Sequence, residues 1–124
     1  MYEVIKMAKV YSNRIYVSAF PGLMINNYKV EYSCNAMEIV ASGVVTYNNN
    51  PVPNIRVDVG FCSYFDFNTN QFRANFTTTT QSDGSFMIYI YTATPPGGGN
   101  CIVAMVQYNG QTAVAHQSIT IPQC

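Results

Sequence analysis

The most obvious shortage in this sequence is of charge. Charged residues make up 10% of the 124 residues, where an ordinary soluble domain has about 25%. The six basic residues are balanced by six acidic ones and form no cluster, so no nucleic-acid partner is predicted. Amides and hydroxyls take the place of charges, as suits an extracellular or virion surface. With no net charge to keep copies apart, the chain is expected to associate.

Long hydrophobic runs are also missing. No apolar stretch approaches the roughly 18 residues that a transmembrane helix needs, so no membrane span is predicted. Residues 1–9 mix charged and apolar side chains and lack the continuous apolar centre of a signal peptide. We therefore expect either a processed chain whose leader is absent or export by another route, such as assembly into a virus particle.

Residues suited to catalysis are scarce. His116 is the single histidine, and no Ser or Cys nucleophile can be assigned to it from the sequence. The six acids are scattered, so no pair is predicted to face a common cleft. Asp83-Gly84 indicates a turn rather than a calcium site, and residues 97–99, three glycines, indicate a flexible loop rather than a phosphate cradle. We predict no enzyme activity, no cofactor and no metal site.

Helical periodicity is absent as well, and strand periodicity takes its place. Apolar residues alternate with polar ones, as in Ile55-Arg56-Val57-Asp58-Val59, and turn-forming pairs such as Asn109-Gly110 separate the runs. The predicted strands are 3–11, 14–20, 28–33, 39–47, 55–62, 72–80, 85–92, 101–108 and 112–121. Strands at intervals of about ten residues without helical crossovers predict an all-β antiparallel sandwich.

The alternation within 85–92 assigns its side chains to faces. Its even-numbered residues, from Phe86 to Ile90, are expected in the core. Met87, Tyr89 and Tyr91 are then expected on the outer face. This row is either covered by the N-terminal strands of the same chain or forms a contact surface for another molecule.

One N-glycosylation sequon is present, at Asn75-Phe76-Thr77. In the predicted strand 72–80, alternation puts Phe72 and Phe76 on one face and Asn75 on the other, outward face. Asn75 is therefore a candidate for glycosylation if the chain is secreted.

Four cysteines, Cys34, Cys62, Cys101 and Cys124, show neither C-x-x-C nor Cys/His metal spacing. Two disulfides are predicted, which implies an oxidising compartment or a hyperthermophile; four buried free thiols are the alternative. If successive strands reverse direction, all four cysteines fall at the same pole of the sandwich. A disulfide needs Cα atoms within about 7 Å, which this clustering allows. Of the three connectivities we favour Cys62–Cys101, which would join the two long loops, with Cys34–Cys124, which would tie the C-terminus to the segment entering the core.

Residues 39–121 resemble the immunoglobulin-like and transthyretin-like (carboxypeptidase regulatory-like) modules of cell-surface proteins. The resemblance lies in Gly43-Val44-Val45, in the run from Pro51 to Val57, and in Thr79-Thr80-Gln81-Ser82-Asp83-Gly84-Ser85-Phe86. It implies an immunoglobulin-like or transthyretin-like β-sandwich that serves as a spacer, adhesive unit or shell-building block. Residues 1–38 depart from the pattern and add strands. We expect one structural domain, with a 39–124 core and N-terminal strands that complete an edge or are donated to a neighbour.

Two functional hypotheses follow. The favoured one is a non-enzymatic structural subunit of an extracellular assembly: a virion, a pilus-like filament or a surface layer. Its partners are copies of itself or other shell or filament subunits, joined by β-strand addition. The predicted contacts are N-terminal and outer-face apolar residues: Val4, Ile5, Met7, Val10, Met87, Tyr89 and Tyr91. The alternative is a monomeric extracellular carbohydrate- or protein-binding module that uses exposed tyrosines and the loops 62–72 and 92–101.

Overall fold

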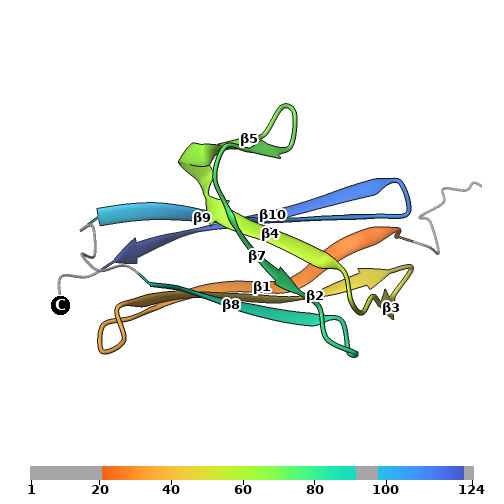
Figure 1. Cartoon of the computed structure of the whole chain (residues 1–124), viewed down its shortest axis with the longest axis horizontal. Coiled ribbons are helices and arrows are strands. Elements are labelled where there is room, and N and C mark those ends of the chain that lie inside the picture. Colours follow the sequence, from red (N-terminus) through yellow and green to blue (C-terminus); the bar gives the residue numbers. More distant parts are fainter. Residues whose placement is uncertain (1–20, 92–97, 122–124) are drawn as a thin grey trace, which may run out of the picture.

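The structure is a computed structural model that describes residues 21–91 and 98–121. Within these residues it consists of two antiparallel sheets packed face to face, with a small hairpin on the outside of one of them (Figure 1). The only helix in the described part is a three-residue 3-10 turn, η1 (Cys62–Tyr64). The predicted all-β sandwich is confirmed. The predicted strands 3–11 and 14–20 lie outside the described residues.

The first sheet is built around β2 (Glu38–Tyr47). One edge of β2 pairs with β1 (Leu23–Ser33), and the other pairs with β8 (Ser85–Tyr91) and with the two-residue β3 (Asn50–Pro51). β1 is longer than the predicted strand 28–33 and is an integral part of the sandwich, although it belongs to the N-terminal segment 1–38. The rest of that segment, residues 1–20, is not described.

The second sheet has the order β10-β9-β4-β7. Its members are β10 (Gln111–Ile121), β9 (Gly98–Tyr108), β4 (Arg56–Phe61) and β7 (Phe76–Thr79). The chain crosses between the sheets after β3, after β7 and after β8, whereas β9 and β10 form a hairpin. These two sets of strands have the arrangement of an immunoglobulin-like sandwich, as the sequence predicted.

The β9–β10 hairpin turns at the predicted residues. Tyr108 pairs with Gln111, and the two residues between them, Asn109 and Gly110, have φ angles of 51° and 75°. A two-residue turn with positive φ at both positions matches the twist of the flanking strands, which is why Asn-Gly is favoured there.

Two predicted boundaries are wrong. The expected strand 72–80 is two short strands, because Phe72 belongs to β6 (Gln71–Phe72) and the next strand begins at Phe76. The glycines expected in a flexible loop are partly in a strand, since β9 begins at Gly98 and pairs with the end of β10. In both cases the pairing partner, which periodicity alone does not identify, decides where the strand begins.

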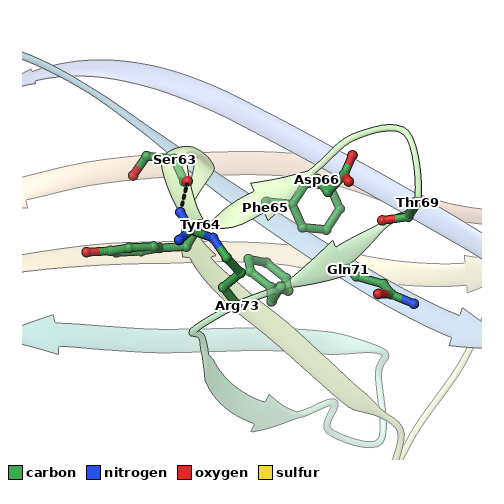
Figure 2. Close-up of a pocket in the computed structure, with 8 residues that line it drawn as sticks. Ser63, Tyr64, Phe65, Asp66, Thr69, Gln71 and Arg73 are labelled. Carbon is green, nitrogen blue, oxygen red and sulfur yellow. Dashed lines mark hydrogen bonds between the residues drawn. The ribbon is translucent and has the colours of Figure 1, made fainter.

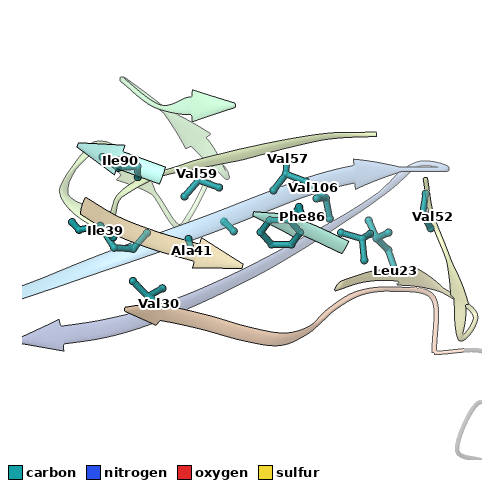
Figure 3. Packing of buried hydrophobic residues seen from close by; sticks show 13 residues of the cluster. Leu23, Val30, Ile39, Ala41, Val52, Val57, Val59, Phe86, Ile90 and Val106 are labelled. Atoms are coloured by element: carbon teal, nitrogen blue, oxygen red, sulfur yellow. The ribbon is translucent and has the colours of Figure 1, made fainter. Parts of the chain in front are cut away.

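The core lies between the two sheets (Figure 3). Val57 and Val59 of β4 are fully buried, as alternation predicted, and Phe86 and Ile90 of β8 face them from the other sheet. The buried cluster consists of small and medium apolar side chains: Leu23, Val30, Ile39, Ala41, Val45, Val52, Val57, Val59, Phe86, Ile90, Ile102, Ala104 and Val106. The core therefore includes β1 through Leu23 and Val30.

A glycine makes room for the largest of these side chains. A Cβ atom at Gly43 would lie 2.9 Å from two ring carbons of Phe86. Since real Cβ atoms do not approach a ring this closely, the Phe86 ring can lie over β2 only because position 43 has no side chain. Gly43 thus makes room for the ring of Phe86, its cross-strand partner in the same sheet.

Candidate functional site

The outer face of the β1-β2-β8 sheet carries the predicted row of apolar side chains. Met87, Tyr89 and Tyr91 are 51%, 59% and 66% exposed, and no described residue covers them. The Tyr89 hydroxyl donates to the Met87 sulfur at 3.1 Å, so two members of the row contact each other. Their cross-strand neighbours on β2 are Ser42, Val40 and Glu38. We call Met87, Tyr89 and Tyr91 the tyrosine row.

Alternate backbone N–H and C=O groups of β8 point away from β2. The Gly84 carbonyl accepts from the Val45 N–H, toward β2. One residue on, the Ser85 carbonyl accepts from the Gln81 N–H, and two residues further the Met87 carbonyl accepts from the Thr78 hydroxyl at 3.3 Å. Because backbone groups alternate in direction along a strand, odd-numbered residues of β8 point away from β2.

The residues of the tyrosine row are therefore also the residues whose N–H and C=O groups face the open edge. Among the described strands, β8 pairs with β2 alone. Beyond Met87, the Tyr89 and Tyr91 backbone groups face a side on which the described chain places no strand. We call the stretch from Met87 to Tyr91 the β8 edge.

The opposite edge of the same sheet is closed by side chains from β10. The Gln117 side chain accepts from the Val30 N–H at 3.2 Å and donates to the Val30 carbonyl at 3.4 Å. Gln111 accepts from the Leu23 N–H at 3.0 Å. These two glutamine amides take the place of a neighbouring strand along β1. Nothing in the sequence pattern indicates this role, because both glutamines occupy core-facing positions of an alternating strand.

The outer face of the second sheet is covered, in contrast to the first. The chain between β4 and β7 forms η1 and a hairpin of β5 (Phe65–Asp66) and β6 (Gln71–Phe72). Phe65 packs on Val103 and Met105, which point outward from β9 and are nevertheless buried. The predicted loop 62–72 is thus a folded element with its own hydrophobic cluster.

Two hollows adjoin this hairpin, and Tyr64 lines both of them. The first, about 260 Å³ in volume, has a polar rim that includes Asp66, Thr69, Gln71 and Arg73 (Figure 2). The second, about 330 Å³, is mostly apolar and is lined by Gly60, Phe61, Tyr64, Ala74, Asn75 and Phe76. The sequence pointed to Asn75 and to the loop 62–72 as a candidate binding loop, but not to Tyr64 or to the hollows themselves. The spaced aromatic residues at positions 61, 65, 67 and 72 were the available signal.

The Tyr64 ring is held in place by Arg73. The Arg73 guanidinium lies 5.2 Å from the centre of the Tyr64 ring and donates to the Ser63 carbonyl at 2.9 Å, as Figure 2 shows. The Arg73 N–H also donates to the Tyr64 carbonyl at 2.7 Å. These contacts hold the Tyr64 ring beside the Arg73 side chain.

The cysteines follow the predicted pairing where the structure describes them. Cys62 and Cys101 form a disulfide with a Cα–Cα distance of 5.3 Å. The register explains this bond. Phe61 pairs with Ile102, so Cys62, which follows Phe61, lies opposite Cys101, which precedes Ile102. Cys34 is also disulfide-bonded; its predicted partner, Cys124, lies outside the described residues.

Two further candidate residues are on the outside of the second sheet. Asn75 is exposed, and its side-chain amide donates to the Asp58 carboxylate at 3.0 Å and to the Phe76 carbonyl at 3.2 Å. Its glycosylation stays a prediction. His116 is exposed on β10 and meets the edge of the Phe67 ring, with 5.4 Å between ring centres. The predicted contacts Val4, Ile5, Met7 and Val10 lie outside the described residues.

No family model matches the chain, and no curated protein matches it. Among solved structures the chain is similar to the "D00-D0 domain of Intimin", with 17% sequence identity and a TM-score of 0.47. The match covers 91% of this chain and 52% of the other, so the chain spans about half the length of that structure. Similarity at this level carries no functional argument. In the described part of the chain, no helix has the length and apolar character needed to cross a membrane.

Proposed function

We propose that this chain is a non-enzymatic structural subunit of an extracellular assembly, such as a virion, a pilus-like filament or a surface layer. The observation that supports the proposal is the coincidence of the β8 edge with the tyrosine row. One short stretch offers outward backbone groups and three exposed apolar side chains. A strand from a neighbouring copy would pair with the outward backbone groups and pack on the exposed side chains.

The asymmetry of the first sheet supports β8 as the accepting side. Exposed strand edges promote association, and proteins commonly cover or block them. Gln111 and Gln117 occupy the edge of β1. Described residues contact the outward backbone groups of β8 only at its start, through the Gln81 N–H on Ser85 and the Thr78 hydroxyl on Met87. Strand addition is therefore directed to one edge of the sheet.

The donor we propose is the segment 3–11 of a neighbouring copy. It reads as a strand and contains the apolar residues Val4, Ile5, Met7 and Val10. Alternate side chains of an added strand point to the two faces of the sheet. One set would lie beside Tyr89 and Tyr91, while main-chain hydrogen bonds supply the affinity.

An extracellular setting is supported by the cysteines and the surface. The Cys62–Cys101 bond and the disulfide at Cys34 suit an oxidising compartment. A surface of amides, hydroxyls and tyrosines with zero net charge lowers the repulsion between copies. Both features fit a subunit that functions in a polymer outside the cell.

The edge is tested by comparing two substitutions at one position. Tyr89→Pro removes an N–H that points away from β2 and blocks the edge, a change that edge strands tolerate. Tyr89→Ala removes the side chain and keeps the N–H. Sedimentation of the full chain should show large assemblies for the wild type, monomers near 13.8 kDa for Tyr89→Pro, and weakened assemblies for Tyr89→Ala.

Two controls make the outcome decisive. Thermal unfolding should show that both variants are folded, and deletion of residues 1–13 should also give monomers if this segment is the donor. A wild-type chain that stays monomeric at every concentration contradicts the proposed function. Normal assembly of Tyr89→Pro contradicts the β8 edge while leaving the side-chain contacts in place.

A further inference from the structure

The insertion between β4 and β7 is longer than a connection between paired strands requires. Such connections commonly take about two to six residues, whereas residues 62–75 lie between these two neighbours in the sheet. The insertion forms a turn, a hairpin and its own buried cluster around Phe65. Loops held rigidly on a sheet frequently carry binding sites, so the exposed side chains of this insertion are candidates for binding a ligand.

The insertion and the first residue of β7 expose aromatic rings. Tyr64, Phe67 and Phe76 are 44%, 49% and 49% exposed. Tyr64 lines both hollows, with the polar rim on one side and the apolar wall of Phe61 and Phe76 on the other. Two adjoining hollows that share one lining residue have the form of a site for consecutive units of a chain-like ligand.

The polar groups around these hollows favour a neutral ligand. The Arg73 guanidinium already donates to the Ser63 carbonyl, and the Asp66 carboxylate accepts from the Asn68 N–H at 2.8 Å. Thr69 and Gln71 add a hydroxyl and an amide, which are uncharged donors and acceptors. Because Asp66 and Arg73 carry opposite charges, the rim has no net charge. Hydroxyl groups therefore suit it better than ionic groups.

We propose that the two hollows on either side of Tyr64 bind a neutral oligosaccharide. One face of a pyranose ring carries C–H groups, which pack on the electron-rich face of an aromatic ring. The edge of the same ring carries hydroxyls, which exchange hydrogen bonds with amides and hydroxyls. In this site one sugar packs between Tyr64 and Phe76, and the next reaches Thr69 and Gln71.

The shape of the site favours an internal stretch of a polysaccharide over an enclosed small molecule. Sites for small ligands usually bury most of the ligand surface, whereas these hollows of about 260 and 330 Å³ lie side by side at the surface. Sugars with equatorial hydroxyls present the flattest C–H faces, so β-linked glucose and N-acetylglucosamine polymers are the expected class. The site is on the second sheet, away from the tyrosine row.

Calorimetric titration of the full chain tests the site with three soluble probes: cellohexaose, chitohexaose and mannohexaose. The protein should be made in a bacterial periplasm, because a glycan attached at Asn75 would occupy the second hollow. We expect binding of cellohexaose or chitohexaose. Tyr64→Ala should weaken it at least about tenfold, while Tyr64→Phe, which keeps the ring, should stay within about twofold of the wild type.

Tyr89→Ala is the matched control, since it removes an exposed tyrosine from the other sheet. It should bind the sugar as the wild type does, although it weakens assembly, and Tyr64→Ala should assemble normally. Binding of none of the three sugars overturns the proposal, as does unchanged binding by folded Tyr64→Ala. Neither result bears on the β8 edge.

Discussion

Both sheets have outward-facing apolar residues, but those of the second sheet are buried and those of the first are exposed. On the second sheet, Val103 and Met105 are 0% and 7% exposed because the β5–β6 hairpin lies over them. On the first sheet, Tyr89 and Tyr91 are more than half exposed. An apolar residue on an outer face is therefore not by itself a sign of a contact surface. What distinguishes the two faces is an insertion that covers one of them.

The largest effect is expected from a charge beneath the hairpin. Val103→Asp places a carboxylate in the buried cluster with Phe65 and Met105, opposite His116 in the pairing of β9 with β10. Removing the carboxylate from water costs more than an exposed imidazole beside it returns, so the free energy of unfolding should fall by about 3 kcal/mol or more. Tyr89→Asp on the other sheet should change it by less than about 0.5 kcal/mol. Urea denaturation of both variants measures the difference, and equal losses would contradict the comparison.

A smaller effect separates inward from outward tyrosines of the first sheet. The half-buried Tyr28 donates its hydroxyl to the Ile102 carbonyl at 3.1 Å, and burial raises its pKa well above the ordinary value. Tyr28→Phe leaves that carbonyl unpaired and should cost about 1 kcal/mol. Tyr89→Phe should cost nothing measurable.

Tyr32 provides the control for this prediction. Its hydroxyl is buried and has no hydrogen-bond partner among the described residues. Removing an unpaired buried polar group relieves a desolvation penalty, so Tyr32→Phe should leave the free energy of unfolding unchanged or raise it slightly. A loss as large as that of Tyr28→Phe in denaturant titrations would show that the hydrogen bond to Ile102 is not what matters.

The smallest effect concerns the turn that leads into the uncovered strand. The Ser85 hydroxyl and N–H donate to the Asp83 carboxylate, at 2.6 and 3.0 Å, and these hydrogen bonds lower the pKa of Asp83. Because the pKa of Asp83 is lowered in the folded state, its ionisation stabilises the protein at pH values above about 4, the ordinary pKa of an aspartate. That stabilisation is lost as the pH falls through the folded-state pKa.

Asp83→Asn should therefore melt slightly below the wild type at neutral pH, and the gap should close in acid. Thermal unfolding followed by circular dichroism across this pH range measures it. The effect is small because the carboxylate is fully exposed and its interactions are screened by water. A gap that widens in acid would contradict the assigned hydrogen bonds.

Local patterns predicted those parts of the fold that depend on neighbouring residues or on register. The Asn109-Gly110 turn follows from the φ angles that these residues accept. The Cys62–Cys101 pairing follows from strand direction and register. The inward positions of Val57 and Phe86 follow from alternation.

The hairpin and its hollows could not be predicted, because their cause is tertiary. Residues 72–80 alternate as one strand would, yet the chain after Phe72 passes so close to β4 that a Cβ at Gly60 would lie 3.0 Å from the Phe72 ring and 3.1 Å from the Ala74 carbonyl. Glycine at position 60 leaves room for this path, on which residues 73–75 do not pair with β4. Whether the tyrosine row is covered is equally a question of packing, and alternation places its side chains on a face without saying what lies over them.

The Cys62–Cys101 disulfide has a mechanical consequence. Its cysteines are 39 residues apart in sequence, and the chain between them includes the hairpin, β7 and β8. When the two ends of the chain are pulled, this segment cannot be drawn out. At about 3.3–3.6 Å per extended residue, the bond withholds roughly 130 Å of extension that an uncrosslinked chain would release. The strand that carries the β8 edge thus belongs to the part of the molecule that tension cannot lengthen.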